Sequence, residues 1–175
     1  IVNGTTQAIG LTAAAQSKMG IPADTPFVYG AFDGALSNLG VGAIKQNTVA
    51  ITIGTSAGVR VVTDHPVIDP QQRLFCYAVD KGLLVIGGPL NNGGDVYQWA
   101  VEHLVDASAV KNENIDPYTL ANQVIEGVPA GAHGLLFHPF LGGERAPLWD
   151  ANVRGSFFGL SHIHTRADML RSVME

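Results

Sequence analysis

The chain has 175 residues, of which 46% are hydrophobic and 14% charged, and its formal net charge is −5. This composition is typical of a globular domain and excludes a disordered chain. Lysine and arginine are scattered singly, without a basic stripe, so we expect no nucleic-acid partner. No apolar run approaches the roughly 18 residues needed to span a bilayer, and we expect no membrane partner. The single cysteine, Cys76, excludes an internal disulfide and fits a reducing cytoplasm, which is the localisation that we expect.

The N-terminal part of the chain predicts two helices separated by a short strand. Small and apolar residues from Ala8 to Ala15 follow the helical period, and Gly20 is expected to cap that helix. The apolar run Phe27–Ala31 predicts a strand, and the small residues of Gly34–Ile44 predict the second helix.

Two β-hairpins are predicted next, because apolar, β-branched runs flank short turns that contain glycine. The expected strands and turns are Val49–Ile53, Gly54-Thr55-Ser56 and Val59–Thr63 for the first hairpin, and Leu74–Val79, Asp80-Lys81-Gly82 and Leu83–Gly88 for the second. The strands are expected to form a mixed sheet in an α/β domain.

The C-terminal part predicts helices and one short buried strand. We expect helices at Asp95–Val105 and Pro117–Ile125, a strand at Leu135–His138 and a long irregular loop at Gly142–Arg154. A capping box from Thr165 to Asp168 opens a last helix. That helix has no C-cap before the final residue, and the chain does not begin with Met, so we expect a piece of a longer protein.

Two glycine-containing turns are candidates for binding an anion. In Gly54-Thr55-Ser56 the backbone N–H groups and two hydroxyls can face a phosphate, although an ordinary polar hairpin turn has the same sequence. The segment Gly87–Gly94 can bring a helix N-terminus toward a phosphate, but it is no Walker motif. Asp95 already supplies the negative charge that the helix dipole prefers, which weakens this second candidate.

Asp33 is a candidate general base, because it lies between a predicted strand and a predicted helix. A carboxylate there can accept the proton of a substrate hydroxyl, or it can simply be the N-cap of the helix. The six histidines do not show the spacing of a zinc site, and we expect no metal ligands in this chain. Ser56 lacks the context of a nucleophile elbow, which argues against a hydrolase.

A long motif in the C-terminal third resembles the second signature of the FGGY carbohydrate kinases. It is Gly142–Asp150, which reads GGERAPLWD and is similar to the Gly-Glu-Arg-x-Pro-x-Trp-Asp loop of that family. Arg154–Leu160 and Asp168–Glu175 continue the signature with its spacing. The resemblance transfers no catalytic role to Glu144, Arg145 or Trp149, which we expect to shape a loop beside the cleft.

Upstream segments resemble the same family in the same order and imply its site residues. The segment around Asp33 resembles the one that carries the catalytic base, and Gly54 with Thr55 resembles the loop that contacts ATP phosphates. Gly94 and Gln98 match a Gly-x-x-x-Gln-Trp pattern that contributes to nucleotide binding in relatives. ATP and Mg²⁺ are the implied cofactors, and the implied partner is a small sugar or sugar acid.

The resemblance also implies the ribonuclease H-like fold of actin and hexokinase, with two lobes around a nucleotide cleft. Residues 1–34 are expected to end the N-terminal, sugar-binding lobe, and residues 35–175 to form most of the C-terminal, nucleotide-binding lobe. The residues that hold Mg²⁺ and most sugar contacts are expected elsewhere in the longer chain, so the fragment alone is expected to be inactive. A homodimer is a further possibility.

The predicted reaction is ATP-dependent phosphorylation of gluconate to 6-phosphogluconate, because several segments look closest to the gluconate kinase branch. These segments are Phe32–Gly40, Thr52–Ser56, Arg73–Ala78 and Gly87–Gly94. Two alternatives stay open: a kinase for xylulose, glycerol or another polyol, and a non-catalytic nucleotide-binding module, if the chain is complete as given.

Overall fold

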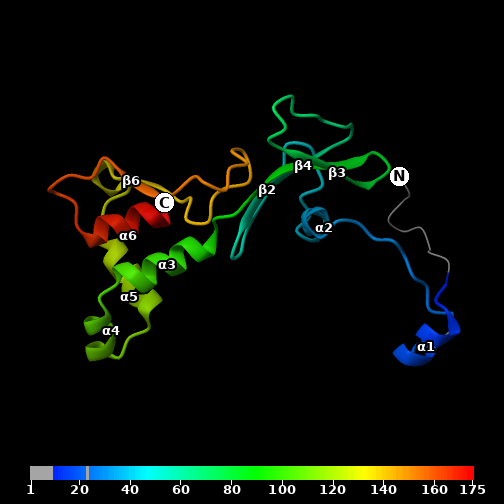
Figure 1. Cartoon of the computed structure of the whole chain (residues 1–175), viewed down its shortest axis with the longest axis horizontal. Helices are drawn as coiled ribbons and strands as arrows, with labels where there is room; N and C mark the ends of the chain where they lie inside the picture. Colours follow the sequence, from blue (N-terminus) through cyan, green and yellow to red (C-terminus); the bar gives the residue numbers. More distant parts are fainter. Residues whose placement is uncertain (1–9, 23) are drawn as a thin grey trace. The chain divides into compact units, whose positions relative to one another are not determined.

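The computed structural model describes residues 10–22 and 24–175, and the chain folds into two compact units (Figure 1). The first unit comprises Ile1–Ile51 and Val59–Gly88, and the second comprises Thr52–Gly58 and Pro89–Glu175. Ala8, where the first predicted helical stripe begins, lies outside the described residues. Among the described residues, no helix combines the length and the apolar character that crossing a bilayer requires.

The first unit begins with two short helices. Helix α1 (Ala13–Met19) is capped by the Thr12 hydroxyl and ends at Gly20, whose φ of 64° confirms the predicted C-cap. Helix α2 (Asp33–Gly40) is shorter than predicted, and the chain turns at Gly42 with a φ of 72°. Glycine reaches this left-handed conformation without steric cost, so the helix ends early.

The strand predicted at Phe27–Ala31 is wrong. The structure has only an isolated bridge residue there, Val28. Gly30 adopts a φ of 65°, which is incompatible with an extended strand, and Pro26 lacks the N–H that a sheet ladder uses.

Both predicted β-hairpins are confirmed and contribute to one four-stranded sheet with the strand order β1-β2-β4-β3. The strands are β1 (Val49–Ile53), β2 (Ala57–Thr63), β3 (Phe75–Asp80) and β4 (Leu83–Leu90). Strands β3 and β4 pair antiparallel around Gly82, which has a φ of 72°. Ala35 of α2 packs with Val62 and Val85 of the sheet, and together they form the core of this unit.

The second unit is largely helical, and its helices bury a separate core. It contains α3 (Gly94–Leu104), α4 (Ala107–Glu113), α5 (Pro117–Glu126) and α6 (Arg166–Met174). Ala100, Ile125 and Leu170 bring α3, α5 and α6 together in that core. Helices α3, α5 and α6 were predicted to within one or two residues. Helix α4 was missed, because its short, mostly polar sequence carries no clear apolar period.

Two short strands, β5 (Leu136–His138) and β6 (Ser156–Phe158), form an antiparallel pair in the second unit. Strand β5 was predicted and β6 was not. The prediction that β5 is buried is wrong, since Leu136 is 58% exposed and His138 is also exposed. The predicted capping box is confirmed, since the Asp168 carboxylate accepts a hydrogen bond from the Thr165 amide at 2.7 Å. Helices and strands share the chain, so the predicted α/β class is confirmed.

Candidate active site

The turn between β1 and β2 is hydrogen-bonded to the N-terminus of α3, within the second unit. The Gly94 amide donates to the Gly54 carbonyl at 2.7 Å, and the Asp95 amide donates to the Thr55 carbonyl at 3.4 Å. The turn is closed on itself by the Gly54 amide, which donates to the Ser56 carbonyl at 2.8 Å. Three of the four residues predicted to bind nucleotide, Gly54, Thr55 and Gly94, are therefore brought together.

Glycine at positions 93 and 94 permits this close approach. A Cβ atom on Gly93 would lie 2.7 Å from the Ser56 carbonyl carbon and 2.9 Å from the Gly54 carbonyl oxygen. A Cβ atom on Gly94 would lie 2.9 Å from the same Gly54 oxygen. Because these neighbours are backbone atoms, they cannot turn away as the end of a side chain can.

Backbone amides at the start of α3 donate hydrogen bonds to acceptors within the protein. Besides the two bonds to the turn, the Asp95 carboxylate accepts from the amides of Gly93 and Val96, each at 2.9 Å. A helix N-terminus binds an anion through amides that have no other acceptor. The helix end therefore supports the turn, and the idea that its amides face a phosphate is not favoured. That Gly94 contacts the nucleotide stays a prediction.

The exposed residues Thr55 and Ser56 of the turn carry donors that suit a phosphate. Within the described part of the chain, neither hydroxyl nor either backbone amide of these two residues donates to a partner. Two hydroxyls and two N–H groups close together are donors of the kind that phosphate oxygens accept from. The turn can thus bind phosphate while its carbonyls hold α3.

Gln98 lies one helical turn beyond Gly94 on the same face of α3. Its side chain is exposed and donates to the Glu102 carboxylate at 2.8 Å. A contact between Gln98 and nucleotide stays a prediction.

The signature loop holds the segment before α3 through one buried carboxylate. Glu144 is only 5% exposed. One of its oxygens accepts from the amides of Asn91 at 2.6 Å and Arg145 at 2.8 Å. The other accepts from the Asn92 side-chain amide at 3.0 Å. These donors compensate the loss of water around the buried charge.

Further bonds join the same two segments. The Asn92 side chain donates to the Gly143 carbonyl at 2.7 Å and accepts from the Gly142 amide at 3.2 Å. The Arg145 guanidinium donates to the Leu90 carbonyl at 2.8 Å. We call this set of contacts between Pro89–Asn92 and Gly142–Ala146 the loop clamp. Glu144 and Arg145 therefore shape the signature loop, and its place beside the cleft stays a prediction.

Asp33 lies in the first unit, as the first residue of α2. It is exposed, and its carboxylate accepts from the amide of Gly34 at 2.6 Å. The alternative that Asp33 is the N-cap is wrong, since Phe32 occupies that position and makes no side-chain cap. An exposed carboxylate at the start of a helix is available to accept a proton from a bound hydroxyl.

The helix that carries Asp33 is anchored to β2 by a buried arginine. Arg60 is 9% exposed and donates to the Asn38 side-chain oxygen at 3.0 Å and to the Ser37 hydroxyl at 2.8 Å. The Ser37 hydroxyl in turn donates to the Gly34 carbonyl at 2.7 Å. The first turn of α2, and with it the Asp33 backbone, is therefore tied to the sheet.

His133 and His138 serve local structure. Nδ1 of His133 lies 2.8 Å from the buried Asp168 carboxylate, and Nδ1 of His138 lies 2.9 Å from the Ser156 hydroxyl. The hydrogen bond from His133, with those from Thr165, holds the pKa of the Asp168 carboxyl well below its usual range. No group of three or more His, Cys, Asp or Glu side chains in residues 10–22 and 24–175 is arranged to hold a metal ion.

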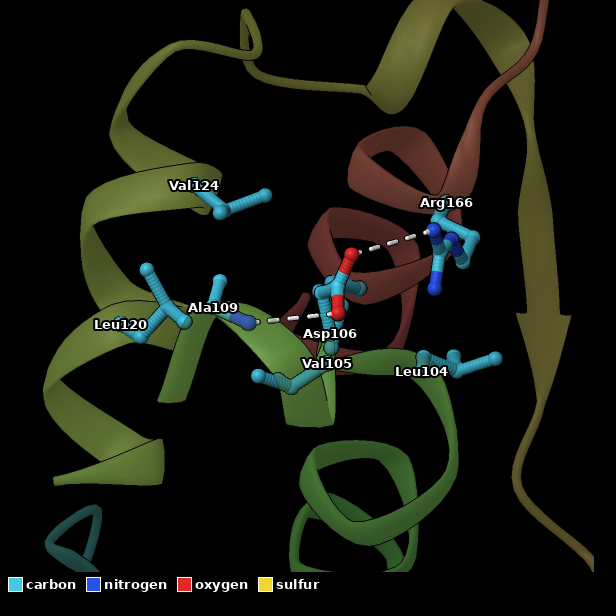
Figure 2. Close-up of a pocket in the computed structure, with 8 residues that line it drawn as sticks. Leu104, Val105, Asp106, Ala109, Leu120, Val124 and Arg166 are labelled. Atoms are coloured by element: carbon cyan, nitrogen blue, oxygen red, sulfur yellow. Dashed lines mark hydrogen bonds and ion pairs between the residues drawn. The ribbon is translucent and has the colours of Figure 1, made fainter. Parts of the chain in front are cut away.

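A hollow of about 180 Å³ lies between the end of α3 and the helices α4, α5 and α6 (Figure 2). Aliphatic side chains such as Leu120 and Val124 line most of it. The Asp106 carboxylate at its edge caps α4 by accepting from the Ser108 and Ala109 amides, and it lies 3.8 Å from the Arg166 guanidinium. None of the predicted site residues lines this hollow.

Comparison with known proteins identifies the family. The C-terminal domain of the FGGY family of carbohydrate kinases matches residues 49–175. The chain therefore belongs to the FGGY family of carbohydrate kinases. It is 50% identical over 161 residues to a gluconokinase from Bacillus licheniformis, covering 91% of this chain and 31% of that protein. It thus spans about a third of the length of this curated relative.

Two solved structures from Lactobacillus acidophilus share the fold. A gluconate kinase superposes with a TM-score of 0.88 at 42% identity, covering 99% of this chain and 34% of the other. A ligand-bound xylulose kinase gives a TM-score of 0.88 at 41% identity with the same coverage. These neighbours confirm the expected fold, the ribonuclease H-like fold of actin and hexokinase.

The part of the site that was not predicted is the role of Asn91 and Asn92. Both lie in a glycine-rich segment whose sequence indicates a turn before α3. Two adjacent side-chain amides in such a turn are a signal for bonds to a second loop, because asparagine can donate and accept at once. The sequence does not show which loop it is.

Proposed function

We propose that the whole protein transfers the γ-phosphoryl group of ATP to gluconate and produces 6-phosphogluconate. The observation that carries this proposal is 50% identity to a gluconokinase over 91% of the chain. In keeping with the predicted domains, residues 1–34 would end the sugar-binding lobe and residues 35–175 would form most of the nucleotide-binding lobe. The expected surroundings are the cytoplasm, without a nucleic-acid or membrane partner and with a homodimer possible.

We assign Asp33 to the sugar acid and the other predicted site residues to ATP. Asp33 accepts a hydrogen bond from the hydroxyl of the sugar acid and takes its proton as the new P–O bond forms. The bond from the γ-phosphorus to the β–γ bridging oxygen breaks at the same time, and ADP leaves. In phosphoryl transfer such a base mainly orients the nucleophile, while positioning and charge stabilisation lower most of the barrier. The Gly54-Thr55 turn holds phosphate oxygens through the Thr55 amide and hydroxyl. Gly94 and Gln98 lie along the face of α3 that we assign to the nucleotide.

Mg²⁺ supplies charge neutralisation to the nucleotide phosphates when it is bound. We assign none of this chain's residues to the ion, because the residues that hold it are expected elsewhere in the longer chain. Mg²⁺ commonly binds through phosphates, water and one or two carboxylates.

Phosphorylation of xylulose is the second candidate. It is favoured by the xylulose kinase from Lactobacillus acidophilus, which superposes as well as the gluconate kinase does. Initial rates of the whole protein with ATP and with gluconate, xylulose or glycerol separate the two. We expect kcat/KM to be highest for gluconate, and a preference for xylulose would refute the proposed substrate. Absence of turnover with any acceptor would favour the non-catalytic module, for which calorimetry with ATP then measures binding.

Asp33→Asn tests the proposed base. We expect kcat to fall by about 10²–10⁴-fold, the usual contribution of a general base, with little change in KM for ATP. Asp80→Asn is a matched control in the same unit, since Asp80 also accepts a hydrogen bond from the amide of the next residue, at 2.7 Å. Near-normal turnover of Asp33→Asn would exclude Asp33 as the base.

A further inference from the structure

The loop clamp ends one residue before the glycines that hold the predicted phosphate turn. Asn91 and Asn92 bind the Glu144 carboxylate, and Gly93 and Gly94 follow directly in the chain. The Gly94 amide then donates to the Gly54 carbonyl. A continuous path of hydrogen bonds and peptide units therefore runs from Glu144 to the turn.

We propose that Glu144 is a positioning residue for the Gly54-Thr55-Ser56 turn and so for the nucleotide phosphates. The proposal rests on the proposed function, because it takes that turn as the phosphate-binding element. Glu144 is 5% exposed, and its carboxylate accepts bonds from the Asn91 and Arg145 amides and from the Asn92 side chain. It acts by fixing Asn91 and Asn92, and with them the start of α3.

A carboxylate is required at this position because all the groups that face it are donors. Two are backbone amides, of Asn91 and Arg145, and the third is the Asn92 side-chain amide. A glutamine could satisfy the two backbone amides with its oxygen. Its own amide group would then face the Asn92 donor, and one hydrogen bond would be replaced by a repulsive contact.

The clamp is specific to this pair of segments. Asn92 is 8% exposed, and its side chain uses both its amide hydrogens and its oxygen on residues 142–144. The Ala146 amide also donates to the Pro89 carbonyl at 3.0 Å. Both ends of Pro89–Asn92 are held by hydrogen bonds. We therefore expect a displacement of the Glu144 carboxylate to displace Gly93 as well.

Hydrogen exchange in the whole protein tests the positioning directly and does not depend on activity. The amides of Gly54 and Gly94 are the reporters, since each donates to a carbonyl in or beside the turn. We expect Glu144→Ala to increase their exchange rates at least tenfold and Glu144→Gln to have a smaller effect. Glu126→Ala is the control, because Glu126 is exposed on α5 in the same unit. Unchanged exchange at both reporters would overturn the proposal.

Kinetics distinguish positioning from a general loss of stability. We expect kcat/KM for ATP to fall by about 10–100-fold in Glu144→Ala, by analogy with residues that orient metal ligands. KM for the sugar acid should stay within about twofold, and Glu144→Gln should recover part of the loss. A lower melting temperature with unchanged kinetic constants would assign Glu144 to stability alone and refute positioning.

The two proposals fail in different ways. If the wild-type protein phosphorylates none of the acceptors, the proposed function fails, whereas exchange at Gly54 and Gly94 still decides whether Glu144 holds the turn. If Glu144→Ala does not fold, the exchange and kinetic comparison is made with Glu144→Gln, and the same outcomes support or overturn the proposal.

Discussion

Replacing Gly93 by alanine would place a methyl group against the backbone of the predicted phosphate turn. The new Cβ would lie 2.7 and 2.8 Å from the carbon and oxygen of the Ser56 carbonyl, and 2.9 Å from the Gly54 oxygen. Ordinary van der Waals contact begins near 3.4 Å, so the segments must separate by roughly half an ångström or more. That displacement lengthens the 2.7 Å hydrogen bond from Gly94 to Gly54.

Overpacking of this kind costs about 1–3 kcal/mol, and backbone neighbours place Gly93→Ala near the upper end. For a domain of 150–250 residues, about 3 kcal/mol lowers the melting temperature by about 6–12 °C. We expect this decrease in a thermal melt of the whole protein, together with a KM for ATP raised about tenfold. KM for the sugar acid should not change.

Gly40→Ala is the control for Gly93→Ala. Gly40 ends α2, and a Cβ atom there meets nothing within 4 Å. We expect this variant to be neutral or more stable by about 0.5–1 kcal/mol, because alanine loses less backbone entropy than glycine. If Gly93→Ala has the melting temperature and the KM for ATP of the wild type, the contact between α3 and the turn is not tight. That result would refute the reasoning.

Two further variants test other buried polar groups. Arg60→Met removes the donors to Asn38 and Ser37, so these acceptors lose their partners. We expect the free energy of unfolding to fall by about 2–4 kcal/mol. Thermal or urea unfolding measures this change. Asp168→Asn addresses pH dependence. The pKa of the Asp168 carboxyl is lowered in the folded state by the bond from His133, so its stabilisation is present above the unfolded pKa of about 3.9 and is lost as pH falls below it. We expect the melting temperature to fall less between pH 5 and pH 2, a window of about three units, in the variant than in the wild type.

Controls for both variants come from exposed charges. Lys45→Met removes an exposed cation from the first unit, and Glu126→Gln removes an exposed carboxylate from the second. If Arg60→Met has the same free energy of unfolding as Lys45→Met, Arg60 does not anchor α2. If Asp168→Asn and the wild type lose stability in parallel on acidification, the Asp168 carboxylate does not carry the proposed pH dependence.

Local patterns in the sequence were enough to predict much of the secondary structure and the family. The turns at Gly54 and Gly82, the cap at Gly20 and the capping box at Asp168 all depend on residues within a few positions of one another. Such signals act through the chain itself and need no distant partner. The signature at Gly142–Asp150 identifies the family for the same reason, because it is contiguous.

Tertiary structure decided what depends on distant partners. Strand β6 exists only as the partner of β5, and Glu144 binds Asn91, 53 residues away in the chain. From the sequence alone, the amides at the start of α3 could have donated to a ligand. In the structure, two of these amides donate hydrogen bonds to the carbonyls of Gly54 and Thr55. A hydrogen-bonding group looks the same in the sequence whether it is free or paired. Folding selects the partner, and the partner determines which groups remain for a ligand.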